Sequence, residues 1–302
     1  MSGWDRAFHA YGPARGGDVL LDVLRSGTEE AYVAEHPDAS WWRQPYSFLW
    51  SGLYCMGRTT PATVLGLRHL IKAVVADDFG GADPVLRWAV LWWIRDVVRT
   101  AVTSGDLDKA RLLAARRNEP FVTEWLEDHL RHERSILEWD DTSPGHVLTA
   151  AARVDCFDFL PKCFPPLSAL LTAHQPEEVR AAAASAASML VRHPALRHHR
   201  DQVAAYHADQ ARHGSPRHRA SMLIGLGDLG VPTTPWLTDP DLGVRVCAAL
   251  APSAAGDETT VEVLRAASRD PALNDVFDGM GLHQLTDLTG SVAEALKAAM
   301  KR

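Results

Sequence analysis

Apolar residues recur at helical spacing along the whole chain, and sustained two-residue alternation is scarce. The pattern predicts a helix over about Pro84 to Thr103, with apolar residues on nearly every side, as in a helix buried on most of its circumference. Prolines precede many apolar segments, at first-turn positions where a missing N–H costs nothing. They are Pro61, Pro84, Pro120, Pro144, Pro176, Pro216, Pro240 and Pro271. We therefore expect an all-α protein.

Three segments of the C-terminal half share one arrangement of residues. Each contains a proline near its start, then an arginine, then a run of small and aliphatic residues. The segments are Gln175 to Leu190 with Arg180, Ser215 to Leu229 with Arg219, and Asp239 to Leu250 with Arg245. Repeated helical hairpins of this kind are typical of an α-solenoid. We expect small residues to let hairpins approach closely, the arginines to tie neighbouring repeats together, and the aspartate before Pro240 to cap its helix.

The third segment, Asp239-Pro240-Asp241-Leu242-Gly243-Val244-Arg245-Val246-Cys247-Ala248-Ala249-Leu250, resembles the HEAT-like repeat, which also occurs in HEAT proteins of the phycobilin lyase type. The N-terminal part resembles a group of actinobacterial HEAT-repeat proteins. Its matching stretches are His9 to Ala14, Leu24 to Gly27, and Leu53 to Thr63. The resemblance implies a right-handed α-solenoid of HEAT-like helical hairpins, from which residues 105–170 depart. A repeat fold does not by itself imply an activity.

Composition separates two parts of the chain. All ten tryptophans except Trp236 lie before residue 140, whereas the C-terminal part is rich in alanine. We place a boundary near Asp140 to Pro144, between Trp-rich helical repeats over residues 1–140 and Ala-rich HEAT-like repeats over residues 141–302. We expect this boundary to mark a change in the residues that line one continuous solenoid, not a flexible linker.

Charge and cysteine usage narrow the class of protein. The net charge of −7 disfavours a nucleic-acid partner, because phosphates require a basic face. The four cysteines form no CxxC pair, as expected for buried thiols in a reducing compartment. The segment Met1 to Gly17 lacks the apolar core of a secretory signal, and no apolar run reaches the roughly 18 residues that span a bilayer. We therefore expect a cytoplasmic protein without membrane contact, and we predict no cofactor.

The predicted helix over about Pro84 to Thr103 carries the first candidate binding residues. Trp88, Trp92, Arg95 and Asp96 could form an aromatic-walled pocket with an embedded ion pair. A partly buried charge needs a partner, so Arg95 and Asp96 should pair with other repeats or with a ligand. Packing of a core helix explains the same residues without a ligand, and we give that interpretation more weight.

A second group of aromatic residues lies earlier in the chain. Tyr46, Trp50 and Tyr54 follow one another at a helical spacing of four, which places them on one helix face, and Arg58 comes next. Three aromatics with polar tips could line a concave groove. They could equally anchor one hairpin on the next, which is the ordinary role of large aromatics in cores and interfaces.

Motifs for metal, nucleotide or nucleophilic chemistry are missing from the sequence. His129 and His132 stand in neither HExxH nor HxxEH order, and their charged neighbours indicate a solvated helix face, so we predict no metal site. The stretch Gly225 to Gly230 resembles a glycine fingerprint, but it ends a predicted helix, and we interpret it as a helix stop.

Two classes of function remain. The first is a HEAT-like binding module whose concave surface holds a protein partner, as an adaptor, a regulator or an immunity protein. The alternative is an enzyme or small-molecule binder with an aromatic pocket in the N-terminal half, for example in secondary metabolism. A DNA glycosylase-like HEAT protein is less favoured, because the chain is acidic. Fully packed Trp88 and Trp92 would argue against the pocket, and a closed cavity with a buried Arg–Asp pair would argue for it.

Overall fold

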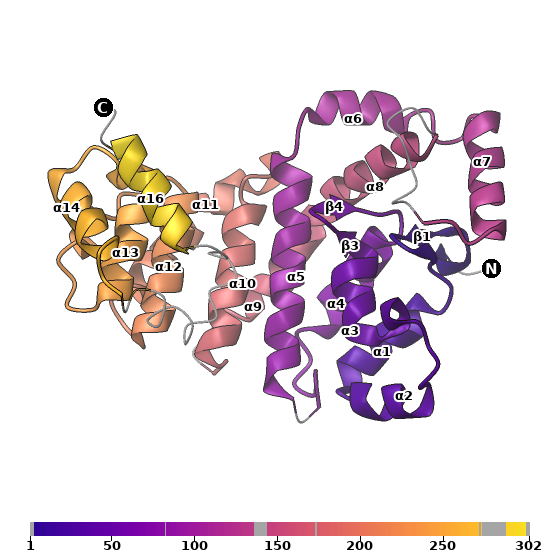
Figure 1. The fold of residues 1–302 in the computed structure, drawn as a ribbon, viewed down its shortest axis with the longest axis horizontal. Helices are drawn as coiled ribbons and strands as arrows, with labels where there is room; N and C mark the ends of the chain where they lie inside the picture. Colours follow the sequence, from indigo (N-terminus) through magenta and orange to yellow (C-terminus); the bar gives the residue numbers. More distant parts are fainter. Residues whose placement is uncertain are drawn as a thin grey trace. The chain divides into compact units, whose positions relative to one another are not determined.

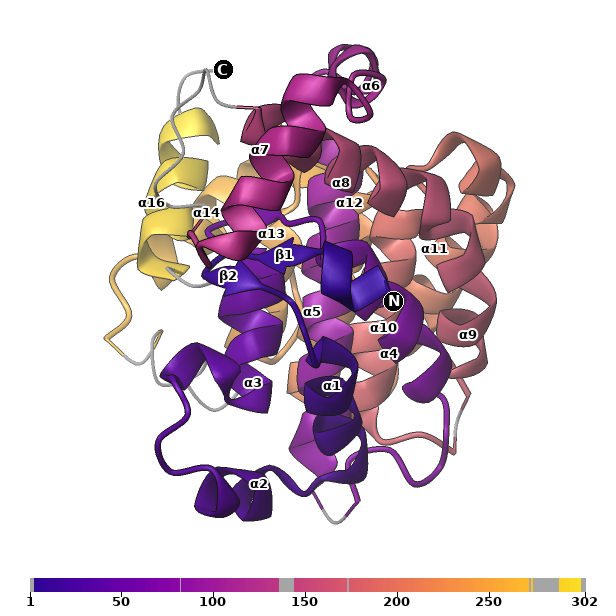
Figure 2. The same ribbon diagram turned by 90° about the vertical axis from the view of Figure 1, so that its right-hand side faces the viewer.

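The computed structural model describes residues 3–81, 83–135, 144–172, 174–271, 273 and 288–299. Most of these residues are helical, and the strands among them form short two-stranded hairpins (Figures 1 and 2). The predicted all-α character is confirmed. The chain divides into two compact units, unit 1 (Met1–Leu170) and unit 2 (Leu171–Arg302). The boundary expected near residue 140 falls on residues 136–143, outside the described residues, and it stays a prediction.

Unit 1 is built around one long helix, α5. Before it come η1 (Gly3–Arg6), β1 (Phe8–His9), β2 (Gly12–Pro13), α1 (Gly17–Ser26), α2 (Glu29–Glu35), η2 (Trp41–Arg43), α3 (Pro45–Ser47), η3 (Phe48–Leu53), β3 (Tyr54–Cys55), β4 (Arg58–Thr59) and α4 (Thr63–Ala73). Then follow α5 (Pro84–Thr103), α6 (Leu107–Ala114), α7 (Pro120–Arg131), α8 (Gly145–Phe159), η5 (Leu160–Cys163) and α9 (Phe164–Ala169). In both views α6 lies at one end of unit 1 and α2 at the opposite end (Figures 1 and 2).

The bounds of α5 agree with those expected from the sequence. Pro84 occupies the first turn, and the Asp83 carboxylate accepts a hydrogen bond from the Val85 backbone N–H at 2.8 Å, which caps the helix. Trp93 and Ile94 are fully buried, and α4 and α8 pack against the helix. Helix α5 is therefore the core of unit 1.

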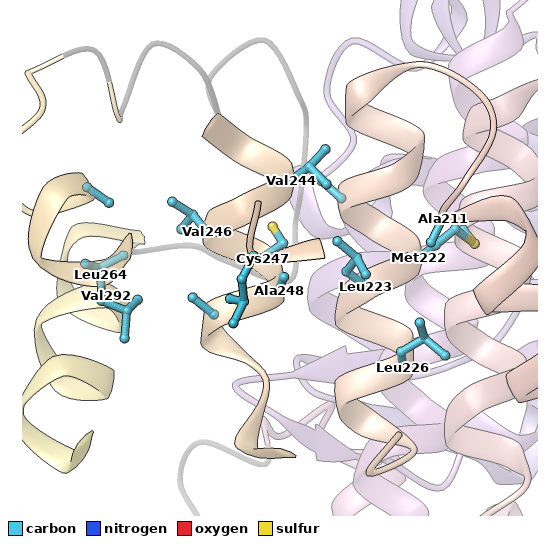
Figure 3. Packing of buried hydrophobic residues seen from close by; sticks show 14 of the residues in the cluster. Ala211, Met222, Leu223, Leu226, Val244, Val246, Cys247, Ala248, Leu264 and Val292 are labelled. Atoms are coloured by element: carbon cyan, nitrogen blue, oxygen red, sulfur yellow. The ribbon is translucent and has the colours of Figure 1, made fainter. Parts of the chain in front are cut away.

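Unit 2 is a succession of helices. They are α10 (Glu177–Leu190), η6 (Pro194–His199), α11 (Arg200–Gln210), α12 (Pro216–Asp228), η7 (Thr234–Trp236), α13 (Leu242–Leu250), η8 (Pro252–Ala254), α14 (Glu258–Ala267) and α16 (Leu288–Ala299). Helix α12 packs against α10, α11 and α13, and α14 packs against α13 and α16. Figure 3 shows α13 between these neighbours, with Val244 on the side of α12 and Val246 on the side of Leu264 and Val292.

Small residues bring helices of unit 2 close together, as expected. A Cβ atom placed on Gly225 of α12 would lie 2.2 Å from Cε1 of His207 on α11, so only glycine fits this contact. Beyond α12, Gly230 adopts a left-handed φ of 66°, and the Val231 N–H bonds back to the Leu226 carbonyl at 2.9 Å. This arrangement ends the helix, which confirms the interpretation of the glycine-rich stretch as a stop.

Proline and aspartate mark helix starts, but not always at the expected positions. Pro84, Pro120 and Pro216 occupy the first turns of α5, α7 and α12, as expected. The first-turn expectation is wrong for four others: Pro144 and Pro176 are the N-cap residues of α8 and α10, and Pro61 and Pro240 precede the N-caps of α4 and α13. The cap of α13 is Asp241, whose carboxylate accepts from the Val244 N–H at 3.0 Å. The expectation that Asp239 caps this helix is wrong, because the Asp239 carboxylate accepts from the Asp241 N–H and pairs with an arginine instead.

The repeated arginines play different roles. The Arg219 guanidinium on α12 pairs with the carboxylate of Asp239, just before α13, and so ties one segment to the next. Arg245 donates to the backbone carbonyls of Asp239 and Pro240, and Arg180 donates to the carbonyl of Gln175 at 2.9 Å. These carbonyls belong to the arginines' own segments. The expected tie between neighbouring segments is therefore confirmed for Arg219.

Candidate functional site

Arg95 and Asp96 of α5, which were expected to pair with other repeats or with a ligand, pair with each other and are partly buried. The Arg95 side chain is 9% exposed, and its Nη1 donates to the Asp96 carboxylate at 2.8 Å. Arg99 also approaches Asp96, at 3.4 Å. The guanidinium of Arg95 lies 5.9 Å from the ring centre of Trp92. These contacts join residues of one helix, so Asp96 is neutralised within α5 itself.

Trp92 is a packed residue and Trp88 is half-buried. Trp92 is 3% exposed, and the two indole rings meet edge to face with centres 6.4 Å apart. This packing supports the interpretation of Trp92 as part of the core of unit 1. A binding role for the group of Trp88, Trp92, Arg95 and Asp96 stays a prediction.

The second aromatic group does not share one helix face. Helix α3 continues as η3, a π-helical turn that ends at Leu53, and Tyr54 begins strand β3. The rings of Tyr46 and Trp50 lie 6.4 Å apart, whereas Tyr54 pairs with Thr59 in the β3–β4 hairpin. The expected helical face is therefore wrong for Tyr54, because spacing places residues on one face only while the helix continues.

An open cleft of about 650 Å³ lies among the β3–β4 hairpin, the C-terminal end of α5, α6 and α8. Its volume is typical of sites for small molecules. Of the residues proposed from the sequence, Arg58 lines this cleft. Tyr54 does not line it; it stands in strand β3 directly before Cys55, which does.

The hairpin that forms one wall of the cleft is attached to α5. Met56 and Gly57, at the two central turn positions, have left-handed φ values of 50° and 78°, as in the type I′ turns that connect two-residue hairpins. The Thr100 hydroxyl donates to the Gly57 carbonyl at 3.3 Å and lies 2.7 Å from the Tyr54 hydroxyl, which is buried. These bonds fix the turn, and with it the start of β4 at Arg58, against α5.

The opposite wall is formed by α6 and α8. Arg153 of α8 donates to the backbone carbonyls of Asp106 and Gly105 at 3.4 and 3.3 Å, and so holds the α5–α6 turn. Burial lowers the pKa of Arg153, an effect that Asp106 opposes, and an arginine remains charged after such a shift. The Asp106 carboxylate accepts from the backbone N–H groups of Asp108 and Lys109 at 2.9 and 3.2 Å. Asp106 is therefore engaged as the cap of α6.

The cleft carries an excess of positive charge. Three cationic side chains line it, those of Arg58, Lys109 and Arg153, against the single carboxylate of Asp106. Arg58 and Lys109 are exposed, and neither side chain forms an ion pair with another residue in the described ranges. In a chain with a net charge of −7, this is a local reversal of sign that attracts anions. Sequence reasoning missed Lys109 and Arg153, because no motif or spacing relates them to Arg58.

The histidine pair on α7 differs from the expectation. His129 is 1% exposed, stacked on Trp125 with ring centres 4.8 Å apart and covered by Phe8, so a fully solvated face is wrong at this position. Burial lowers the pKa of His129 to about 4. His132 is exposed, as expected, beside Asp128.

Within the described ranges, no three His, Cys, Asp or Glu side chains are grouped as metal ligands. The four cysteines are buried free thiols, as expected. No helix in the same ranges has the length and apolar character required to cross a membrane.

Comparison of the chain with models of known protein families, with curated proteins and with solved structures found no match.

Proposed function

We propose that unit 1 is a binding module for a small anionic molecule, which it holds in the cleft bounded by β3–β4, α5, α6 and α8. This corresponds to the small-molecule binder inferred as an alternative from the sequence, but the cleft is not lined by the tryptophans expected to form the pocket. The observation that carries it is the pair of exposed cations, Arg58 and Lys109, which line the cleft and form no ion pair with the residues described. Arg153 adds a third cation. An anion would supply the charge partner that the protein does not provide.

Binding of simple anions tests this proposal. Calorimetric titration at low ionic strength with inorganic phosphate, acetate and hexanoate should show saturable binding of at least one of them. Arg58→Gln and Lys109→Gln should each weaken it by about tenfold, the effect of losing a hydrogen bond to a charged group. The matched control is Lys72→Gln, which removes the same charge from an exposed position of α4 that does not line the cleft. Added salt should weaken binding by screening.

Two results would contradict the proposal. One is the absence of saturable binding for all of these anions. The other is binding that Arg58→Gln and Lys109→Gln leave unchanged, which would place the anion elsewhere on the molecule.

We further propose that α10 to α14 are HEAT-like repeats and that their concave surface holds a protein partner in the cytoplasm. The Arg219–Asp239 pair between successive segments and the packing of α12 on α13 support this proposal. The residues that resemble the HEAT-like repeat, Asp239 to Leu250, include α13. A stoichiometric complex captured by the full chain, and lost on charge reversal at exposed sites of α10 to α14, would support it. A partner that binds the charge-reversed variants equally well would contradict it.

A further inference from the structure

Neither the turn nor packing explains why a methionine stands at position 56. It stands first of the two central residues in the β3–β4 turn, with φ 50°, where asparagine is the residue usually found before glycine. A side chain of this size is rare in the left-handed region. The Met56 side chain is 86% exposed, so it gains almost nothing from burial in return. Strain without compensation is a reason to look for a contact made only with a ligand.

Met56 lies on the rim of the basic cleft, which also has an apolar part. Ala110 and Leu113, three residues apart on α6, lie on the same side of that helix and line the cleft, as does Ala150 of α8. Lys109 stands directly before Ala110. A ligand in the cleft can therefore contact apolar and cationic side chains at the same time.

We infer that Met56 is a specificity-determining residue, which contacts the apolar body of an amphiphilic anion while Arg58 and Lys109 bind its charged group. The ligand class is a carboxylate or phosphate monoester on an aliphatic body. The thioether of methionine suits this role, because the side chain is flexible and adapts to irregular apolar surfaces. The inference rests on the proposed anion-binding function and adds the requirement for an apolar body.

A series of straight-chain carboxylates tests the inference. In calorimetric titrations of the full chain, the affinity should rise by about fourfold for each methylene group from acetate through butanoate to hexanoate, the gain for burying a methylene. Hexyl phosphate compared with hexanoate shows which charged group the cations prefer. The Met56→Asn variant should weaken hexanoate binding by about fivefold, the loss of part of one apolar contact, and leave acetate binding unchanged.

Met56→Asn should not impair folding, so a change in binding can be assigned to the lost side-chain contact. Asn–Gly is the preferred pair for this turn, so the variant should be at least as stable as the wild type. Met56→Leu, which retains an apolar side chain, should keep the dependence on chain length.

Three results would overturn the role of Met56, and only the last of them would also overturn the anion site. Equal binding of acetate and hexanoate, both dependent on Arg58 and Lys109, would overturn the role of Met56 and leave the anion site standing. A chain-length dependence that persists in Met56→Asn would also overturn it. Failure of every anion to bind would overturn both.

Discussion

The hydroxyl groups of Tyr54 and Thr100 lie 2.7 Å apart in the interior of unit 1, and this hydrogen bond joins strand β3 to helix α5. Because the Thr100 hydroxyl also donates to the Gly57 carbonyl, it accepts from Tyr54. Two successive bonds therefore hold the hairpin that carries Met56 and Arg58. The shape of the cleft depends on this attachment.

Removal of the Tyr54 hydroxyl should loosen the hairpin. In Tyr54→Phe the Thr100 hydroxyl loses a buried donor, and the free energy of unfolding should fall by about 1 kcal/mol, as for other single buried hydrogen bonds. Urea unfolding followed by circular dichroism measures this. Tyr32→Phe is the control, since the Tyr32 hydroxyl forms no hydrogen bond with the other described residues. Equal stabilities of the two variants would show that the Tyr54 bond contributes nothing.

The ion pair between Arg219 and Asp239 should be important for unit 2. The side chains are 18% and 9% exposed, so Arg219→Met leaves a largely buried carboxylate without its cation. We expect the free energy of unfolding to fall by about 3 kcal/mol. The double variant Arg219→Met/Asp239→Asn should recover part of this loss, because the uncompensated charge is removed. Arg217→Gln, on the same helix, is the control. A loss below about 1 kcal/mol in Arg219→Met would contradict this prediction.

Acid should destabilise unit 2 through His207. The ring is fully buried and lies 2.6 Å from the Ser188 hydroxyl, and burial lowers its pKa from 6.5 to about 4. Between pH 6.5 and 4, His207 is therefore protonated in the unfolded chain and neutral in the folded one. The neutral ring's contribution to the free energy of unfolding is complete above pH 6.5 and is lost as the pH falls towards 4. The loss is about 3 kcal/mol for a shift of this size.

Urea unfolding between pH 7.5 and 4.5 tests this dependence. Burial also lowers the pKa values of His9 and His129 to about 4, so the wild type should lose stability for more than one reason. The slope should be shallower in His207→Gln and unchanged in His213→Gln, because His213 is exposed. Identical slopes in all three proteins would rule out His207 as a source of the pH dependence.

Local features of the fold were predictable from the sequence. The bounds of α5, the prolines in first turns and the glycine stop after α12 follow from interactions within a few residues of one another. Such interactions belong to the segment itself, so periodicity and turn chemistry suffice to predict them. The cap of α13 was misplaced by two residues because Asp239 is engaged by Arg219, which belongs to the preceding helix, α12.

The conformation of Tyr54 and the composition of the cleft depend on contacts between distant segments. Tyr54 leaves the helical pattern because its backbone pairs with Thr59 and its hydroxyl bonds to Thr100. Arg58, Lys109 and Arg153 come from three separate elements, and packing of α6 on α8 and of α8 on α5 brings them to one cleft.

Periodicity and turn residues along the chain are enough to predict the helical character of this protein and the ends of several helices. Which charged side chains face one another, and which line the cleft without an ion pair among the described residues, depends on how distant segments fold against each other. The physical reason is that hydrogen bonds within a helix connect residues close in the chain, whereas the partner of a charged side chain is set by whichever segment folds against it.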